Sequence, residues 1–295
     1  MLSRYDIEKE FGKNISIYPF NGDNIKENSI NLTASDLAWT QTNFSAYIDE
    51  TSIKAYSKKT SNLKEYTFKK GEKAIIEIFN EKYIVLAPHS VTLIETEEVI
   101  STGPKIGGDF HSKVGLSAIG IGHIGTMLGP NFSGKCLIPL HNVTEDIVLL
   151  KTTKTIVSVT FEYLKSSMTN ESNPTTSGHI EKLSQYGISI SENDSKKIID
   201  DWMTRFNDVK DKMEESESYN KYLKSRKKRS FKEKWLTTRN IIIGSFVAIV
   251  VITSFVLSLV FECKGNTKWA DRLWPTFFSL LISGTGFLLG FVRPR

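Results

Sequence analysis

Two short segments of the sequence carry side chains that suit the binding of phosphate. Serine and histidine supply neutral hydrogen-bond donors, and lysine adds a compact positive charge that is a common partner of phosphate. In the second segment a glycine adds backbone donors at a turn. The six candidate residues are His111, Ser112 and Lys113 in the first segment and Ser133, Gly134 and Lys135 in the second. We expect these residues to contact a phosphate group.

A third segment, residues 120–125, matches the pattern Gly-x-Gly-x-x-Gly. A dinucleotide-binding fingerprint needs a strand before the glycines and a helix after them. The residues that follow run into a turn and another strand, so we reject that interpretation. The glycines are expected to allow a tight turn or a close backbone approach, and His123 between them is expected to be a packed side chain.

Four blocks of the sequence, taken in order, resemble the trimeric dUTPase and dCTP deaminase superfamily, and the deaminase branch in particular. Residues 17–20 and 29–32 resemble its opening "I-x-P" and "S-x-D-L". Residues 86–98 resemble "L-x-P-G-x-x-x-L-x-x-T-x-E", and residues 108–116 stand where the family has "R-S-S". Residues 126–142 resemble "T-x-x-D-P-G-[FW]-x-G" followed by "L-x-N".

The resemblance implies a compact β-fold of jelly-roll type and a homotrimer with nucleotide sites between subunits. Members of the superfamily hydrolyse dUTP or deaminate dCTP, and the deaminases use a glutamate to activate water without zinc. The chain lacks the His-x-Glu and Pro-Cys-x-x-Cys pattern of zinc deaminases. We therefore expect no metal site and no cofactor, beyond Mg²⁺ that accompanies a nucleotide.

The chain departs from the family pattern where catalysis would occur. Pro139 stands at the place of the glutamate, and residues 136–143 contain no carboxylate. His111, Lys113 and Leu116 stand where the family has arginine, serine and arginine. A general base must lie within hydrogen-bond reach of the water that it activates. The nearby candidates are three histidines, of which His111 is the one we retain as a catalytic residue: His111, His123 and His141.

Two further residues of this region are expected to be structural. We expect Asn142 to satisfy backbone groups at a strand end rather than to recognise a base. Cys136 is expected to be a small buried apolar side chain, and Cys263 lies just past the first uncharged stretch.

The elements that must position these residues are short strands. Apolar runs rich in isoleucine, valine, threonine and aromatics alternate with turn residues through residues 14–164, which favours a barrel or sandwich. The fold class we predict is mainly β, a dUTPase-like jelly-roll barrel over residues 1–164, followed by a helical stalk and two transmembrane helices. The predicted strands are 15–20, 74–79, 83–87, 91–95, 135–140, 146–150 and 155–161.

Residues 165–194 are polar and rich in turn formers, so we predict a linker. The following residues 195–240 are predicted to form a helical stalk with a basic collar next to the membrane. An apolar stripe supports the helix up to about residue 223, and it could pack on the β-domain or on copies of itself. The stripe consists of Ile198, Trp202, Phe206, Val209 and Met213.

Residues 241–292 are predicted to form a transmembrane hairpin. The stretches 241–261 and 273–292 contain no charge and are long enough to cross a bilayer as helices. Basic residues concentrate at 221–239 and after residue 292, which places both chain ends on the cytoplasmic side. The expected location is the cell inner membrane with two spans, and the expected partner is the lipid bilayer.

The net charge of +5 does not indicate nucleic-acid binding. The residues after 220 carry a net charge of +11, so residues 1–220 carry −6. We expect no direct contact with nucleic acid, and we interpret the basic collar as attraction to anionic lipid headgroups.

Three functions remain open from the sequence. The first is a membrane-anchored sensor or effector that binds a deoxynucleotide or cyclic nucleotide and has lost catalysis; its two-span tail resembles effectors of bacterial anti-phage defence. The second is an active dCTP deaminase or dUTP hydrolase tethered to the membrane. The third is a structural membrane organiser whose β-domain only forms trimers. For all three we expect a homotrimer or a higher homo-oligomer.

Overall fold

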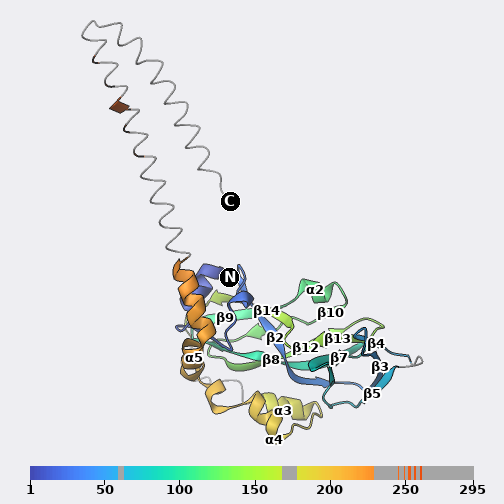
Figure 1. Cartoon of the computed structure of the whole chain (residues 1–295). Helices are drawn as coiled ribbons and strands as arrows, with labels where there is room; N and C mark the ends of the chain where they lie inside the picture. Colours follow the sequence, from blue (N-terminus) through green and yellow to red (C-terminus); the bar gives the residue numbers. More distant parts are fainter. Residues whose placement is uncertain are drawn as a thin grey trace, which may run out of the picture. The chain divides into compact units, whose positions relative to one another are not determined.

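The computed structural model of the chain describes residues 1–58, 63–167 and 178–228, together with six isolated positions between 245 and 260. Contacts divide the chain into two compact units, Met1–Tyr222 and Leu223–Arg295. The first unit is built on an eight-stranded sheet that curls around its own core (Figure 1). The prediction that residues 1–164 are mainly β is therefore confirmed.

The large sheet is antiparallel in every pair, in the order β10-β12-β8-β2-β14-β9-β11, and β1 pairs with β8. The long central strands β2 and β8 are buried along most of both faces. The strands are β1 (Ile15–Tyr18), β2 (Ser29–Thr40), β8 (Ser90–Thr102), β9 (Ile106–Ser112), β10 (Ile121–Gly122), β11 (Met127–Leu128), β12 (Ser133–Asn142) and β14 (Thr155–Tyr163).

Two three-stranded sheets flank the large sheet, in the orders β13-β7-β6 and β4-β3-β5. They share an apolar cluster that includes Ile48, Phe68 and Val85. Their strands are β3 (Phe44–Asp49), β4 (Lys54–Tyr56), β5 (Lys64–Phe68), β6 (Ile75–Ile78), β7 (Glu81–Leu86) and β13 (Val148–Lys151). The helices before residue 165 are short: α1 (Arg4–Glu10), the 3₁₀ turn η1 (Gly22–Asn24) and α2 (Val114–Ser117).

The predicted polar linker over residues 165–194 is wrong for the residues that the structure describes there. Helix α3 (Gly178–Gln185) lies inside it and packs on the large sheet. Leu183 is fully buried against Leu37, Trp39 and Leu93. A few apolar side chains are enough to hold the helix, because the sheet offers them a continuous apolar surface.

The predicted continuous helical stalk from residue 195 is also wrong. The segment breaks into α4 (Glu192–Ile198), the 3₁₀ turn η3 (Asp201–Thr204), α5 (Phe206–Glu215) and a helix over residues 217–228. Ile199, Asp200 and Arg205 have extended backbone angles, and the Asp200 side chain caps η3. The apolar stripe packs on β1 and β8 of the same chain, which decides between the two partners left open by the sequence.

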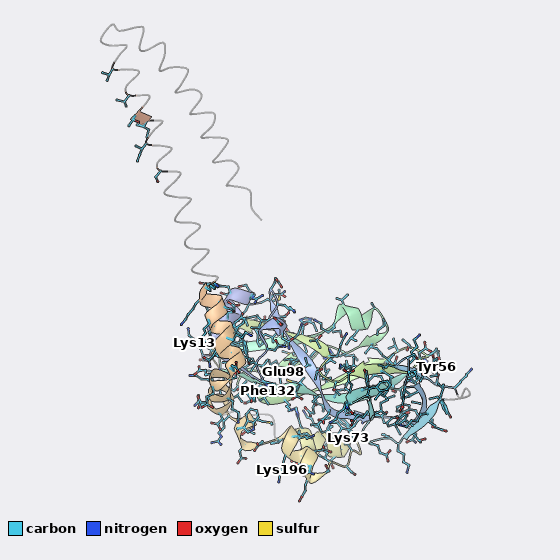
Figure 2. The ribbon with its side chains drawn as sticks, in the orientation of Figure 1. Lys13, Tyr56, Lys73, Glu98, Phe132 and Lys196 are labelled. Atoms are coloured by element: carbon cyan, nitrogen blue, oxygen red, sulfur yellow. The ribbon has the colours of Figure 1, made fainter. Side chains whose placement is uncertain are left out.

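Ion pairs attach α4 to the sheet. Asp36 on β2 contacts Lys82 at 2.7 Å and Lys197 of α4 at 3.3 Å. Asp194 of α4 contacts Lys73 at 2.6 Å, on the face where Figure 2 shows Lys73. Burial raises the pKa of both carboxyls, but the hydrogen bonds and charges of the lysines outweigh it and hold each pKa below its usual value. The free state of α4 therefore binds more protons than the attached state.

This linkage predicts that α4 detaches in acid. With folded pKa values below the unfolded values, the stabilisation is fully present above about pH 4 and is lost as the pH falls through the folded pKa values. Because the pairs are partly exposed, each should contribute about 1 kcal/mol or less. Urea unfolding at pH 6 and at pH 3.5 should show a smaller pH dependence for Asp36→Asn/Asp194→Asn than for the unchanged chain. If the free energy of unfolding changed by the same amount between pH 6 and pH 3.5 in both proteins, the linkage would be contradicted.

The two predicted membrane spans, 241–261 and 273–292, lie outside the described residues except for isolated positions in the first. Among the residues that the structure describes, no helix combines the length and the apolar character needed to cross a bilayer.

Candidate functional site

The first predicted phosphate segment lies at the end of β9. This strand pairs with β14, where His111 is opposite Ser158 and Ser112 is opposite Val157. After Ser112 the chain leaves the sheet and begins α2 at Val114, so Lys113 occupies the turn between strand and helix.

Lys113 is the centre of a hydrogen-bond network. Its ammonium group donates to Asn31 Oδ1 at 2.8 Å and to Ser158 Oγ at 3.1 Å, and Ser158 Oγ also donates to Asn31 Oδ1 at 2.8 Å. Burial, with a smaller contribution from the charge of Lys26, lowers the pKa of Lys113. Among the described residues no carboxylate forms an ion pair with this ammonium group. The site therefore holds a positioned cation without an anionic partner.

Ser112 has a different role from the one predicted. Its hydroxyl donates to the carbonyl oxygen of His123 at 2.8 Å and accepts from the backbone N–H of His123 at 2.9 Å. The hydroxyl proton is thus already used, and Ser112 fixes the loop around residue 123. Gly122 in this loop pairs with His141 of β12, which brings β9, β10 and β12 together.

The three candidate histidines lie near one another. His123 is buried as predicted, and burial followed by the charges of His141 and His111 lowers its pKa. Both ring nitrogens of His123 and Nδ1 of His141 are buried without a hydrogen-bond partner among the described residues. His111 Nε2 lies 3.1 Å from Thr160 Oγ1. Within the described residues His, Cys, Asp and Glu form no group of three or more that could hold a metal ion.

The second predicted phosphate segment lies elsewhere in the chain. Ser133, Gly134 and Lys135 begin β12, whereas the opposite end of that strand, at His141, pairs with the loop that Ser112 holds. Ser133 Oγ is buried and donates to the carbonyl oxygen of Met203 at 2.7 Å. Gly134 has a positive φ of 151°, and Lys135 is buried beside a cavity. One chain therefore does not combine the two segments into a single site.

The position of the family glutamate is covered by apolar side chains. Pro139 pairs with Leu93 of β8, and Leu93 belongs to the cluster that Leu183 of α3 completes. The nearest buried carboxylate on β8 is Glu95, opposite Leu137, with Oε1 at 3.3 Å from His179 Nδ1. Cys136 is buried as predicted, and burial raises the pKa of its thiol well above the usual value.

Sequence reasoning missed the two partners of Lys113. Asn31 stands in the block that resembles "S-x-D-L", so its place in that block was the available signal. Ser158 lies in a run of residues whose pattern predicts only a strand. Sequence reasoning also missed Glu98, whose buried carboxylate accepts from the backbone N–H of Thr33 at 2.7 Å and from its hydroxyl at 2.8 Å. Burial raises the pKa of Glu98 more than these bonds lower it.

Solved structures with partial similarity to this chain include a dCTP deaminase and two dUTPases. A dCTP deaminase from Agrobacterium tumefaciens aligns at a TM-score of 0.37 and 13% identity, over 62% of this chain and 52% of that one. This chain thus spans about half the length of that deaminase. The EIAV dUTPase aligns at a TM-score of 0.26 and 13% identity, over 35% of this chain and 92% of that one. The dUTPase of S. aureus phage phi11 aligns at a TM-score of 0.26 and 12% identity, over 32% of this chain and 79% of that one.

No curated protein matches the sequence at a significant level. The family model described as dCTP deaminase-like matches residues 1–164. This match covers more than half of the chain and the same residues as the four sequence blocks. The chain belongs to the dCTP deaminase-like family.

Proposed function

We propose that the chain binds a nucleotide through its phosphate groups at Lys113 and acts as a sensor or effector without deaminating it. The observation that carries the proposal is the Lys113 ammonium group, which Asn31 and Ser158 hold in place while no described carboxylate neutralises it. A phosphate oxygen would supply the counter-charge, and hydrogen bonds to charged groups are among the strong ones. Family membership supports a nucleotide as the carrier of that phosphate.

Loss of catalysis is the second part of the proposal. β12 offers no carboxylate between Lys135 and Thr144, and Pro139 takes the place at which the family resemblance expects the glutamate. Apolar side chains pack over the partner strand at that point. Water activation needs a base within hydrogen-bond reach, and a packed apolar face excludes water from it.

Assembly and attachment complete the proposal. We infer a homotrimer with the ligand between subunits, because β9 and the start of β12 are separated within one chain and the family resemblance implies shared sites. The uncharged stretches 241–261 and 273–292 and the basic residues before them support attachment to a membrane. A ligand-driven effect on that membrane, as in anti-phage effectors, is the role that this combination suggests.

An active deaminase is the second candidate function. The observation in its favour is the buried Glu95 carboxylate, which lies beside His179 and two residue pairs along the β8–β12 ladder from Pro139. If this carboxylate replaces the family glutamate, the chain should convert dCTP to dUTP, and Glu95→Gln should abolish the product without weakening nucleotide binding. Chromatography of dCTP and dUTP after incubation with the purified chain distinguishes the two functions.

Replacing Lys113 by methionine should weaken binding of dCTP or dUTP about tenfold or more, because the phosphate loses a charge-assisted hydrogen bond of about 1.5–3 kcal/mol. Titration calorimetry on the purified chain measures the affinity. Lys105→Met is the matched control, since Lys105 is exposed in the turn between β8 and β9 and uses only its backbone in a hydrogen bond. Unchanged affinity in Lys113→Met, or the absence of binding in the unchanged chain, would overturn the proposal.

A further inference from the structure

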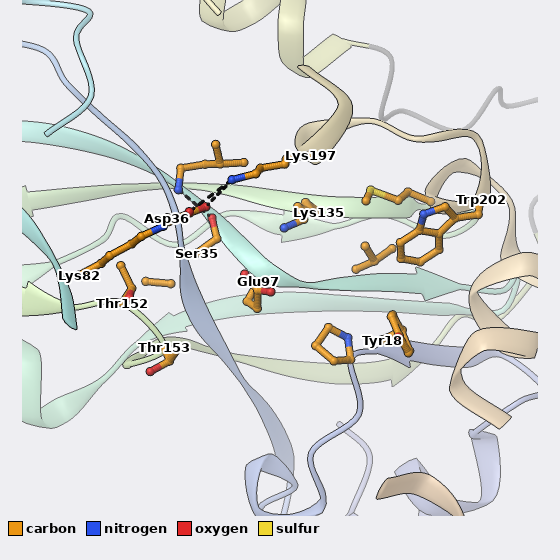
Figure 3. Close-up of a pocket in the computed structure, with 15 residues that line it drawn as sticks. Tyr18, Ser35, Asp36, Lys82, Glu97, Lys135, Thr152, Thr153, Lys197 and Trp202 are labelled. Carbon is orange, nitrogen blue, oxygen red and sulfur yellow. Dashed lines mark hydrogen bonds and ion pairs between the residues drawn. The ribbon is translucent and has the colours of Figure 1, made fainter. Parts of the chain in front are cut away.

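A cavity of about 520 Å³ lies between the sheet and the segment that follows the family domain. Strands β2, β8 and β12 form its floor, and Lys197 of α4 with Trp202 and Met203 of η3 closes one side. Its volume lies in the range of small-molecule sites. Figure 3 shows a polar end around Asp36 and an aromatic end around Tyr18 and Trp202.

Lys135 is the exceptional residue of this cavity. The residue as a whole is only 8% exposed, but its ammonium group is not among the fully buried, unpaired polar atoms of the described chain. Figure 3 shows that group directed toward the end of the cavity where Ser35 and Asp36 lie. The buried stem of Lys135 thus holds its ammonium group at the cavity wall, where a ligand anion can reach it.

The charges around Lys135 favour an anion. Asp36 is already paired with Lys82 and Lys197, at 2.7 and 3.3 Å, so its charge is not available to Lys135. The polar end therefore presents more positive than negative charge. Glu97 lines the cavity from β8 and is exposed, without an ion pair to Lys135. Its carboxylate is an acceptor for hydroxyl groups of a ligand.

The other end of the cavity suits a flat ring. The rings of Tyr18 and Trp202 meet edge to face, with their centroids 5.6 Å apart. Val99 and Met203 add apolar surface beside them. Aromatic walls of this kind contribute apolar contact and preferred ring geometries to a bound aromatic group.

We propose that this cavity is a second ligand site, which takes a mononucleotide with its phosphate on Lys135, its sugar hydroxyls on Glu97 and its base against Tyr18 and Trp202. The site is separate from that of Lys113, because neither Lys113 nor its partners Asn31 and Ser158 line the cavity. Because α4 and η3 supply part of its wall, the ligand holds residues 192–204 on the sheet. Occupancy is thereby coupled to the C-terminal segment.

The test uses the purified 295-residue chain and three probes. AMP carries ring, sugar and phosphate, ribose 5-phosphate lacks the ring, and adenosine lacks the phosphate. Calorimetry should show saturable binding of AMP and about tenfold weaker binding of each of the other two. Hydrogen exchange in residues 192–204 should slow when AMP is added. Absence of saturable AMP binding, or ribose 5-phosphate binding as tightly as AMP, would overturn the proposal.

Variants locate the site. Lys135→Met should weaken AMP binding about tenfold or more, while Lys105→Met should leave it unchanged. Lys197→Ala, at the polar end of the cavity, should weaken AMP binding about threefold. This variant is the second test if Lys135→Met does not fold. Lys113→Met should retain AMP binding in the cavity, so failure of this proposal and failure of the Lys113 proposal are distinguishable. Full AMP affinity in both Lys135→Met and Lys197→Ala would contradict the assignment.

Discussion

Replacing Val209 by aspartate should detach α5 from the β-domain and remove about 3–5 kcal/mol of stabilisation. Val209 is fully buried and packs in one cluster with Val99 of β8 and Met203 of η3. Tyr18 and Trp202 pack against the same cluster. An aspartate there would lose these apolar contacts and bury a charge, and the helix would separate from the sheet to hydrate it.

The measurement is hydrogen exchange of α5 together with urea unfolding of the whole chain. Asn207→Asp is the matched control, because it places the same carboxylate at an exposed position in the first turn of the same helix, where a negative charge is favourable. Exchange in residues 206–215 should accelerate strongly in Val209→Asp and remain unchanged in Asn207→Asp. Similar exchange in the two variants would show that α5 does not depend on this cluster.

The prediction of one continuous helical stalk is wrong because it rested on the spacing of apolar residues alone. The apolar stripe from Ile198 to Met213 keeps a helical spacing across two interruptions, because every one of its elements lies against the same sheet. Periodicity reports which face is covered and does not report whether the backbone is continuous. The local signals of the breaks were Asp200, which caps η3, and the extended residue Arg205.

The β-fold was predictable for a related reason. Strands such as β14 consist mainly of β-branched and apolar residues in runs of the right length, so their existence follows from local sequence. Which strands pair with one another does not follow from local sequence. Asn31 and Ser158 are 127 residues apart and meet only because β2 pairs with β14. The phosphate candidate Lys113 was therefore found from its residue type, whereas the groups that position it required the sheet topology.

The same limit applies to Lys135. Its sequence neighbours Ser133 and Gly134 suggested a phosphate turn, and the strand continues through all three residues instead. What distinguishes Lys135 is burial beside residues from β2, β8 and η3, which no spacing along the chain encodes. A lysine that lines a cavity becomes recognisable only when the surroundings of its side chain are known.

Replacing Asn142 by aspartate should cost about 2–4 kcal/mol at pH 7. The buried Asn142 Nδ2 donates to the carbonyl oxygens of Leu86 and Asp146, at 3.1 and 2.8 Å. Its Oδ1 accepts from the backbone N–H and the hydroxyl of Thr144, at 3.0 and 2.7 Å. All donors and acceptors of the amide are thus used at the strand end, which agrees with the predicted structural role. An ionised carboxylate would oppose two carbonyl oxygens.

The pH dependence makes the prediction specific. The two carbonyl oxygens and the burial should raise the folded pKa of the new carboxyl above the unfolded value of about 3.9. The folded state then binds more protons, so the loss of stability should be small below pH 4 and grow as the pH rises. Urea unfolding at pH 4 and pH 7 measures this growth relative to the unchanged chain. Asn142→Ala, which removes the donors without adding a charge, should lose the same stability at both pH values. A loss independent of pH in Asn142→Asp would mean that water reaches the carboxyl, and that this strand end is open enough to contact a ligand.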